Sequence, residues 1–293
     1  MTTSIRTVCV LGTGTMGQGI AQVTASAGLA TRMFDAAPGR AEQAVAAVSA
    51  QLEKLVGKGK VTSEQRDATL ASLRVATDVR DACDGVDLVV EAAPENMELK
   101  VKLLSEVVLA SPPHALLGSN TSSLSLTELG ARIGAPERTV GLHFFNPPPV
   151  MELLEVVRGI STSDATVEAA VAFAAHIGKS AIVVRDVPGF ASSRLGVILG
   201  AEAIRMLESG VASVGDIDRA MELGYRHPMG PLKLTDLVGL DVRLAILDHL
   251  HRELGEQFRV PPLLRQMVRA GKLGKKSGEG FYVWKDGVAQ PRA

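Results

Sequence analysis

Residues 7–35, TVCVLGTGTMGQGIAQVTASAGLATRMFD, decide the fold of this chain. Their apolar pattern predicts a short strand at 7–11 and a helix at 18–27, followed by a second strand at 29–34. The glycine-rich stretch 12–17 falls between the first strand and the helix. A strand, a tight glycine turn and a helix in this order open a βαβ unit, so the chain begins as an α/β protein.

The turn at 12–17 has the spacing GxGxxG, which predicts a dinucleotide site when it joins a strand to a helix. Gly12 permits the tight turn, Gly14 lets the backbone approach a pyrophosphate, and Gly17 lets the helix pack closely. The first N–H groups of the helix then face the phosphates. The turn residues expected to bind the dinucleotide are Gly12, Gly14, Thr15, Met16 and Gly17.

Asp35 closes the second strand, where an acid is expected to bind the adenosine ribose hydroxyls and to repel a 2′-phosphate. This position predicts NAD as the cofactor. Arg32 and Arg40 stand close enough in sequence to leave NADP open as an alternative.

Strands and helices go on alternating up to residue 186, which predicts a doubly wound parallel sheet. The further strands are expected at 86–90, 115–119, 140–144, 150–157 and 181–184. Two helices are expected between the second strand and the next one, and the second of these helices starts with a capping box at Thr62 and Gln65. The helix pair predicts a projecting hairpin with Lys54 and Lys58 near its tip. From residue 187 onward the patterns are helical. The prediction is therefore a Rossmann-like domain at 1–186 and an all-helical domain at 187–293.

Composition narrows the classes of function. The 293 residues carry a formal net charge of −1 without a basic stripe, which argues against a nucleic-acid partner. No apolar run reaches the roughly 18 residues that span a bilayer, and the N-terminus has no signal-peptide pattern, so a cytoplasmic enzyme is expected. Cys9 and Cys83 fit no metal-ligand spacing and are expected to be buried, reduced thiols.

His143 is the candidate proton acceptor among six histidines. It ends a predicted strand, and in open parallel sheets ligands bind beyond the carboxyl ends of the strands. An imidazole can take the hydroxyl proton when a hydride leaves a secondary alcohol near neutral pH. Glu152 and Glu155 lie in the next apolar strand, where a carboxylate needs a partner. Alternation places them on opposite faces and leaves open which one meets His143.

Two polar segments follow other strands. In Ser119-Asn120-Thr121-Ser122-Ser123, either Ser122 or Ser123 is a natural N-cap for a helix at 124–133, and the other serine is left to bind a substrate oxygen. Glu95 and Lys100 open another helix, where they either contact the nicotinamide ribose or are solvated charges.

The chain resembles the L-3-hydroxyacyl-CoA dehydrogenase family, including the short bacterial 3-hydroxybutyryl-CoA dehydrogenases, essentially from end to end. The resemblance rests on the glycine turn and on the segments Glu91-Ala92-Ala93-Pro94-Glu95-Asn96, Ser119-Asn120-Thr121-Ser122-Ser123, His143-Phe144-Phe145-Asn146-Pro147, Pro188-Gly189-Phe190, Gly230-Pro231-Leu232 and Lys276-Ser277-Gly278-Glu279-Gly280-Phe281-Tyr282.

The resemblance implies roles for individual residues. His143 is the catalytic histidine, Glu155 rather than Glu152 its partner, and Ser122 the serine that orients the substrate. The implied NAD contacts, besides the glycine turn and Asp35, are Glu95, Lys100, Asn120, Asn146 and Lys276. Coenzyme A is implied to run along the hairpin near Lys54 and Lys58, whose charges suit its phosphates; a merely solvated tip is the alternative. No metal is implied.

One position departs from the family pattern. After Pro188-Gly189-Phe190 the family usually places an asparagine that helps hold the substrate, and Ser193 stands there instead. We expect Ser193, with Ser192 as an alternate donor, to take over this role at a cost of about 0.5–1.5 kcal/mol.

The predicted function is oxidation of an (S)-3-hydroxyacyl-CoA to the 3-oxoacyl-CoA with NAD. The alternatives are a dehydrogenase of a free hydroxy acid or sugar acid, and a nucleotide-binding protein without turnover. The resemblance implies a place in fatty acid metabolism such as beta-oxidation, with aromatic catabolism and polyester synthesis left open. The helical domain is expected to cover the substrate and to form a homodimer, because Leu234, Leu237, Val238, Leu240, Leu244 and Leu247 exceed the needs of its core.

Overall fold

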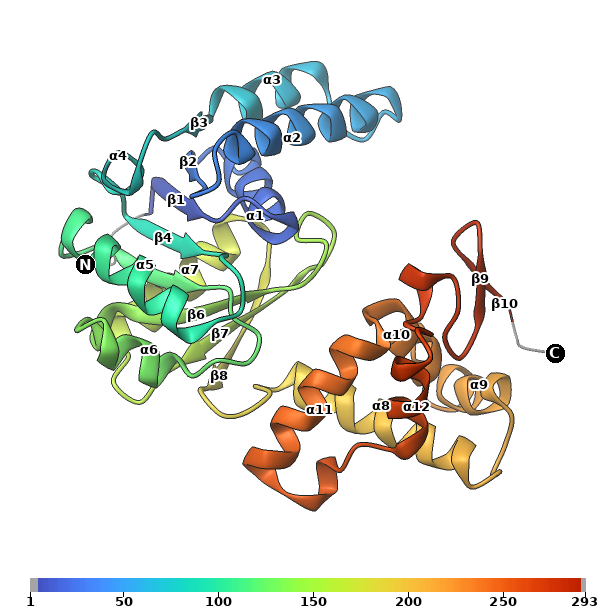
Figure 1. Ribbon diagram of the computed structural model, residues 1–293. Coiled ribbons are helices and arrows are strands. Elements are labelled where there is room, and N and C mark those ends of the chain that lie inside the picture. The colour runs from blue at the N-terminus through green and yellow to red at the C-terminus, as the bar shows by residue number, and fades with distance from the viewer. Residues whose placement is uncertain (1–4, 291–293) are drawn as a thin grey trace. The chain divides into compact units, whose positions relative to one another are not determined.

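The structure is a computed structural model that describes residues 5–290. It divides into two compact units, one ending at Val187 and the other beginning at Pro188. The division falls one residue after the boundary predicted from the sequence. Figure 1 shows the first unit as a sheet flanked by helices and the second as a group of helices with one small hairpin.

The sheet of the first unit has eight strands in the order β3-β2-β1-β4-β5-β6-β7-β8. The strands are β1 (Thr7–Leu11), β2 (Ala30–Phe34), β3 (Leu73–Val75), β4 (Leu88–Glu91), β5 (Leu116–Ser119), β6 (Thr139–Phe144), β7 (Leu153–Arg158) and β8 (Ser180–Arg185). The first strand, β1, lies inside the sheet, and the order in which strands are added reverses there: β2 and β3 lie on one side of β1 and β4 onward on the other. This order is expected for a doubly wound sheet. The three-residue β3 was not predicted.

The sheet is not parallel throughout, which corrects the prediction. β7 runs antiparallel to β6, and β8 then runs parallel to β7. Only residues 145–152 connect β6 to β7, because β7 begins at Leu153 and not at residue 150. A parallel return needs a crossover of about a dozen residues or more, so this connection permits only an antiparallel neighbour.

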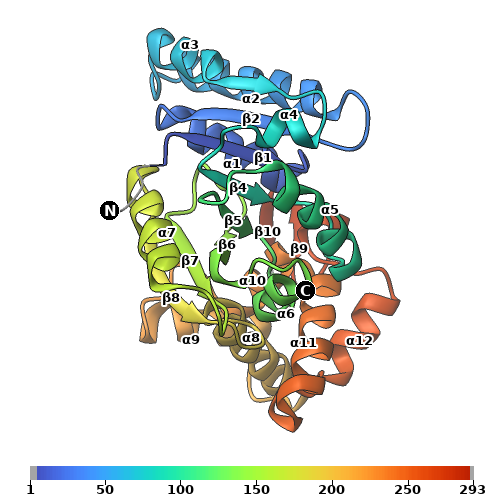
Figure 2. The ribbon, with the colours of Figure 1, turned by 90° about the vertical axis from the view of Figure 1, so that its left-hand side faces the viewer.

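Helices cover both faces of the sheet (Figures 1 and 2). The helices are α1 (Thr15–Ser26), α2 (Arg40–Gly57), α3 (Ser63–Ala71), α4 (Val79–Cys83), α5 (Met97–Ala110), α6 (Leu126–Arg132) and α7 (Asp164–His176), with a 3₁₀ turn at Pro136–Arg138. Ile20 of α1 and Phe173 of α7 share one hydrophobic core with Val10 and Leu142 of the sheet. α4, α5 and α6 pack against one another in sequence.

The α2–α3 pair forms the predicted hairpin, which extends beyond the sheet at the top of Figure 1. α2 buries one stripe formed by Ala41, Ala44, Val48 and Leu52. The Thr62 hydroxyl accepts a hydrogen bond from the Gln65 N–H while the Gln65 side chain accepts one from the Thr62 N–H, so the capping box is confirmed.

Cys9 of β1 and Cys83 of α4 are buried free thiols, as predicted. They are neighbours in space although 74 positions separate them. Burial and the adjacent Cys83 together raise the pKa of the Cys9 thiol. Both side chains therefore belong to the core beneath the sheet.

The second unit contains five α-helices and a small hairpin within the described residues. These are α8 (Ser192–Glu208), α9 (Val214–Gly224), α10 (Pro231–Val238), α11 (Leu240–Leu254), α12 (Pro262–Arg269), β9 (Val283–Lys285) and β10 (Val288–Gln290), with 3₁₀ turns at Glu256–Phe258 and Lys275–Ser277. The unit is helical as predicted, and the β9–β10 hairpin is an addition that the sequence did not reveal.

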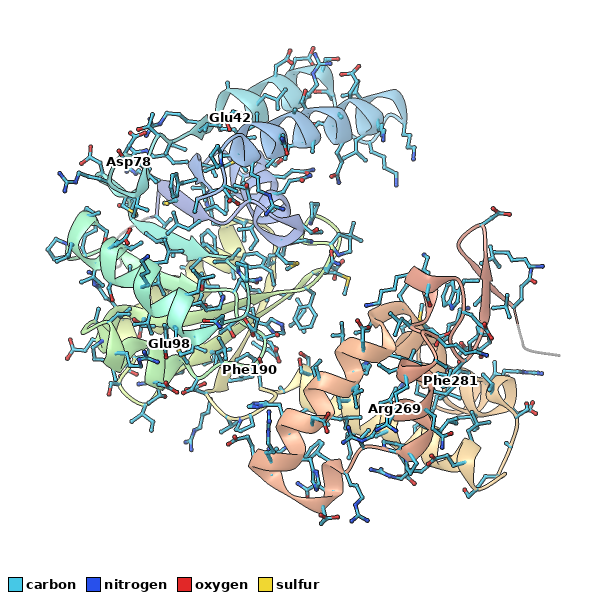
Figure 3. All side chains as sticks on the ribbon, viewed as in Figure 1. Glu42, Asp78, Glu98, Phe190, Arg269 and Phe281 are labelled. Carbon is cyan, nitrogen blue, oxygen red and sulfur yellow. The ribbon has the colours of Figure 1, made fainter. Side chains whose placement is uncertain are left out.

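A buried carboxylate attaches the C-terminal segment to these helices. Asp236 of α10 accepts hydrogen bonds from the backbone N–H groups of Phe281 and Tyr282 and from the indole of Trp284. Phe281, labelled in Figure 3, packs in the core of this unit. Phe190, also labelled there, follows Gly189 between β8 and α8, and both residues have positive φ angles.

Candidate active site

The centre of the site is a hydrogen bond between His143 and Glu155. His143 lies on β6 directly opposite Glu155 on the antiparallel β7. Its Nδ1 is 2.7 Å from Oε2 of Glu155, whose side chain is fully buried, while His143 is 7% exposed. The carboxylate can only accept, so Nδ1 carries the proton of this hydrogen bond and Nε2 is the basic nitrogen of the neutral ring.

Glu152 does not share this position. It lies before β7 and is exposed, and its backbone carbonyl accepts a hydrogen bond from Ser180. The alternation that left both glutamates open therefore resolves in favour of Glu155, because only residues within the strand face β6.

The loop after His143 is held against the first unit. The ring of Phe145 stands 4.7 Å from the His143 ring, measured between centroids. Pro148 packs on α1 at Gly19, where even a Cβ would lie only 2.8 Å from the proline ring. Asn146, between these two contacts, is exposed. The imidazole thus sits on a strand end that has little freedom to move.

Asn120 reinforces the same strand end. Its Oδ1 accepts a hydrogen bond from the Phe144 N–H at 2.9 Å, so the amide joins the end of β5 to the end of β6. The sequence assigned Asn120 to the cofactor only. The structure gives its oxygen a bond within the protein.

Glu91 is the functional neighbour that sequence reasoning missed. Its buried carboxylate accepts hydrogen bonds from the Lys100 ammonium at 2.7 Å and from the Ser119 hydroxyl at 2.6 Å, as well as from the Ala93 N–H. Lys100 is 1% exposed, which rules out the solvated charge considered from the sequence. The available signal was an acid at the end of an otherwise apolar strand, since such a group requires a buried partner.

Glu95 organises the serine segment. Its Oε1 accepts hydrogen bonds from the hydroxyl of Thr121 and from the backbone N–H groups of Ser122 and Ser123. Burial opposes the ionisation of Glu95, but the Thr121 hydroxyl and the positive charge of Lys100 outweigh it, so its pKa is lowered. Glu95 is therefore a carboxylate at neutral pH.

The predicted N-cap is wrong. α6 begins at Leu126, and its N-cap is Ser125, whose hydroxyl accepts a hydrogen bond from the Glu128 N–H. Both Ser122 and Ser123 instead donate their hydroxyls to Glu95, at 3.3 Å and 3.0 Å. The local pattern misled because the Glu95 carboxylate, which is distant in sequence, binds the donors of both serines and the helix begins only at Leu126.

The glycine turn has the shape that a pyrophosphate requires. Gly12 has φ +87°, and a Cβ on Gly17 would lie 1.8 Å from the Gly12 carbonyl oxygen, so neither position tolerates a side chain. Apart from Gly14 and its two chain neighbours, no atom of the described residues lies within 4 Å of a Cβ placed on Gly14. α1 begins at Thr15 rather than at residue 18, and no side chain caps its first N–H groups. These donors and this open space fit a bound phosphate group.

Asp35 stands beside this turn. Its Oδ2 accepts from the Thr13 N–H at 2.7 Å and its Oδ1 from the Ala37 N–H at 3.0 Å. Although burial raises the pKa of Asp35, these hydrogen bonds and the charge of Arg40 produce a net lowering. A pocket lined by Phe34, Asp35, Gly39 and Thr77, among others, adjoins the carboxylate.

Arg32 cannot serve a 2′-phosphate in this conformation. Its guanidinium donates to the backbone carbonyls of Asp81 and Asp84. Arg40 is exposed and adds only its charge near Asp35. The residues around Asp35 therefore fit NAD better than NADP.

The remaining predicted residues lie on the α2–α3 hairpin or in the helical unit. Lys54 and Lys58 are exposed on the hairpin of the first unit. In the helical unit Lys276 forms an ion pair with Asp241, with 2.6 Å between Nζ and Oδ2. Ser193 occupies the first turn of α8, directly after Ser192. Among residues 5–290 no cluster of three metal-ligating side chains occurs, and no helix is long and apolar enough to cross a membrane.

A glycine turn for a dinucleotide and a carboxylate-bound histidine on one sheet define an NAD-dependent oxidoreductase. Comparison with known proteins agrees. Residues 7–187 match the family model described as 3-hydroxyacyl-CoA dehydrogenase, NAD binding domain, and residues 189–284 match 3-hydroxyacyl-CoA dehydrogenase, C-terminal domain. The chain belongs to the 3-hydroxyacyl-CoA dehydrogenase family.

Individual relatives cover nearly the whole chain. A probable 3-hydroxybutyryl-CoA dehydrogenase of Bacillus subtilis is 43% identical over 96% of this chain and 98% of the relative. A 3-hydroxyadipyl-CoA dehydrogenase of Escherichia coli is 41% identical over 97% of this chain, which spans 60% of that longer protein. The crystal structure of (S)-3-hydroxybutyryl-CoA dehydrogenase from Ralstonia eutropha has a TM-score of 0.92 at 42% identity and covers 97% of this chain and all of that one.

Proposed function

We propose that this protein interconverts (S)-3-hydroxyacyl-CoA and 3-oxoacyl-CoA thioesters, with 3-hydroxybutyryl-CoA within its substrate range. The observation that carries the proposal is the 2.7 Å contact between His143 and Glu155 at the end of a dinucleotide-binding sheet. Bound NAD would supply the acceptor for the hydride from carbon 3 of the substrate. The protein binds and orients the substrate and removes its hydroxyl proton.

His143 takes that proton on Nε2 as the carbon–oxygen bond gains double-bond character, and returns it in the reverse direction. The ring becomes an imidazolium that carries the acquired proton on Nε2 and donates its Nδ1 proton to the Glu155 carboxylate. Because Glu155 is fully buried, its charge stabilises the imidazolium with little screening by solvent. Its bond to Nδ1 also fixes the tautomer that presents a basic Nε2.

Ser122 is the substrate-orienting residue of the proposal on the first unit. It is half-buried, and its hydroxyl and N–H both face the Glu95 carboxylate. Glu95 thereby fixes the place from which the Ser122 hydroxyl can meet a substrate oxygen. Ser193 is proposed as the second orienting group, at the start of α8.

The cofactor contacts remain proposals. Gly12, Gly14, Thr15, Met16 and Gly17 would hold the pyrophosphate and Asp35 the adenosine ribose, while Glu95, Asn120, Asn146, Lys100 and Lys276 are assigned to the nicotinamide side. Of these, Lys100 acts through Glu91 and Glu95, because its ammonium already donates to Glu91 and to the Ala93 carbonyl. The coenzyme A phosphates are assigned to Lys54 and Lys58.

The test of the function is reduction of acetoacetyl-CoA by NADH, followed as loss of NADH absorbance. We expect rapid turnover by the wild type, slower turnover with NADPH, and none with free acetoacetate. His143→Asn should remove turnover while leaving NADH binding intact. Rapid reduction of the free acid, or an active His143→Asn variant, would contradict the proposal.

A homodimer through the helical unit is also proposed. Leu240 and Leu247 are buried in the core of that unit, so they do not support an interface as the sequence suggested. Its exposed apolar side chains do: Leu195, Leu223, Tyr225, Leu237, Val238 and Val242. Light scattering coupled to size exclusion should give the mass of a dimer, and Leu223→Glu should shift it toward the monomer. The cytoplasmic location and the role in fatty acid metabolism remain predictions.

A further inference from the structure

Arg243 is a buried cation that has no counter-ion among residues 5–290. It lies in the first turn of α11, is 7% exposed, and its Nε has no hydrogen-bond partner. Among the described residues no acid forms an ion pair with it, and Asp241, two positions earlier, is bound to Lys276. Burial lowers the pKa of Arg243 to about 10, which still leaves the guanidinium charged at neutral pH.

This placement is unfavourable in two independent ways. An unpaired charge that has left water is costly, and native proteins pair such groups with an anion. A cation in the first turn of a helix also faces the positive end of the helix dipole. An anion bound to the guanidinium would remove the cost of the unpaired charge, and it would itself be stabilised by the positive end of the helix dipole.

The neighbouring helix indicates where that anion belongs. A Cβ on Gly196 of α8 would lie 3.5 Å from Nη1 and 3.9 Å from Nη2 of Arg243, so the guanidinium lies along the helix at a position without a side chain. Gly196 follows Ser193 by three residues, which places both on one face of α8 about one turn, or roughly 5 Å, apart. Ser193 is the group proposed to orient the substrate at carbon 3.

We propose that Arg243 binds the terminal carboxylate of a dicarboxylic acyl chain, so that 3-hydroxydicarboxylyl-CoA thioesters are substrates of this enzyme. The inference rests on the proposed function. A guanidinium is the side chain best shaped to bind a carboxylate through two parallel hydrogen bonds. A chain with its carboxylate three carbons beyond carbon 3 suits a separation of one helical turn.

The test compares 3-oxoadipyl-CoA with 3-oxohexanoyl-CoA, which has the same chain length without the charge. The wild type should favour the carboxylated substrate in kcat/KM by about tenfold or more, as a charge-assisted bidentate contact provides. Arg243→Leu should remove that preference and change the uncharged substrate by less than about threefold. Arg243→Lys should retain part of it. Arg252→Leu, at an exposed arginine of the same helix, is the matched control and should behave as wild type.

Binding measurements separate this inference from the function on which it rests. Adipyl-CoA should bind more tightly than hexanoyl-CoA in calorimetry, and Arg243→Leu should equalise them. If neither 3-oxo substrate is reduced yet the binding difference disappears in the variant, the proposed function fails and the carboxylate site stands.

Three results would overturn the inference. The first is an unchanged substrate preference in Arg243→Leu. The second is an equal loss of kcat/KM on both substrates, which would place the anion on coenzyme A. The third is a change of oligomeric state without any substrate dependence, which would place the anion on a second copy of the chain. Folding is checked by urea denaturation, where removal of the unpaired charge should leave the midpoint the same or higher.

Discussion

Replacing Glu155 by glutamine tests the assignment of the proton acceptor most directly. The change keeps the size of a fully buried side chain but removes its charge, so the fold should persist. A hydrogen bond to a charged group contributes about 1.5–3 kcal/mol, which alone corresponds to roughly a 10- to 150-fold effect on rate. The effect is larger if the glutamine amide donates to Nδ1, because the ring proton then moves to Nε2 and the ring can no longer accept one there. In hydrolases with a histidine base, the equivalent loss of a carboxylate costs up to about 10⁴-fold.

The assay is steady-state reduction of acetoacetyl-CoA by NADH, with kcat and KM measured separately. Glu155→Gln should lower kcat by at least about 30-fold, a value inside the range expected from loss of the charged hydrogen bond alone, with KM and NADH affinity little changed. Glu152→Gln is the matched control, because Glu152 is exposed and precedes β7. A kcat for Glu155→Gln within threefold of wild type, or an equal loss in the control, would refute the role given to the pair.

Three further predictions concern the surroundings of the pair. Gly17→Ala should prevent folding, since its Cβ would lie 1.8 Å from the Gly12 carbonyl oxygen. Gly14→Ala should have the melting temperature of wild type without cofactor but should bind NAD more weakly. A wild-type melting temperature for Gly17→Ala would contradict this. Lys100→Met leaves the Glu91 carboxylate buried without its cation and should lower the free energy of unfolding by about 3–5 kcal/mol in urea titrations. Because the pKa of Glu95 is lowered, its ionised form stabilises the fold fully above its ordinary pKa of 4.5, and this stabilisation is lost as the pH falls through the folded-state pKa. Glu95→Gln should therefore be less stable than wild type at pH 7 and should lose less stability than wild type below pH 4.5. Melting temperatures of the two proteins that change in parallel with pH would contradict this.

Local features were predictable because the chain encodes them within a few residues. The glycine turn, the position of Asp35 and the capping box at Thr62 each depend on neighbours in sequence. The direction of β7 was not predicted, although the short connection at 145–152 contained the signal. Its length excludes a crossover, and recognising that would have placed Glu155 opposite His143 without any resemblance.

The partners of buried charges were not predictable from local pattern. Lys100 has the spacing of a surface residue in an amphipathic helix, and only the strand packing of Glu91 turns it inward. Ser122 and Ser123 suit an N-cap, but Glu95 lies 27 and 28 positions away and competes for their donors. Arg243 likewise carries no sequence signal, because its lack of a partner is a property of three-dimensional neighbours.

The polar contacts around His143 form one connected series across the ends of adjacent strands. Glu91 on β4 bonds Ser119 on β5, the adjacent Asn120 bonds Phe144 on β6, and His143 on β6 bonds Glu155 on β7. Each bond joins neighbouring strands, and the side chains of Glu91, Ser119, His143 and Glu155 are buried. A base held in this way cannot shift without stretching a hydrogen bond in the interior, where an unmet polar group is costly. Several polar residues near the glycine turn therefore serve the reaction by fixing the imidazole, and their loss should lower kcat even where they touch neither substrate nor cofactor.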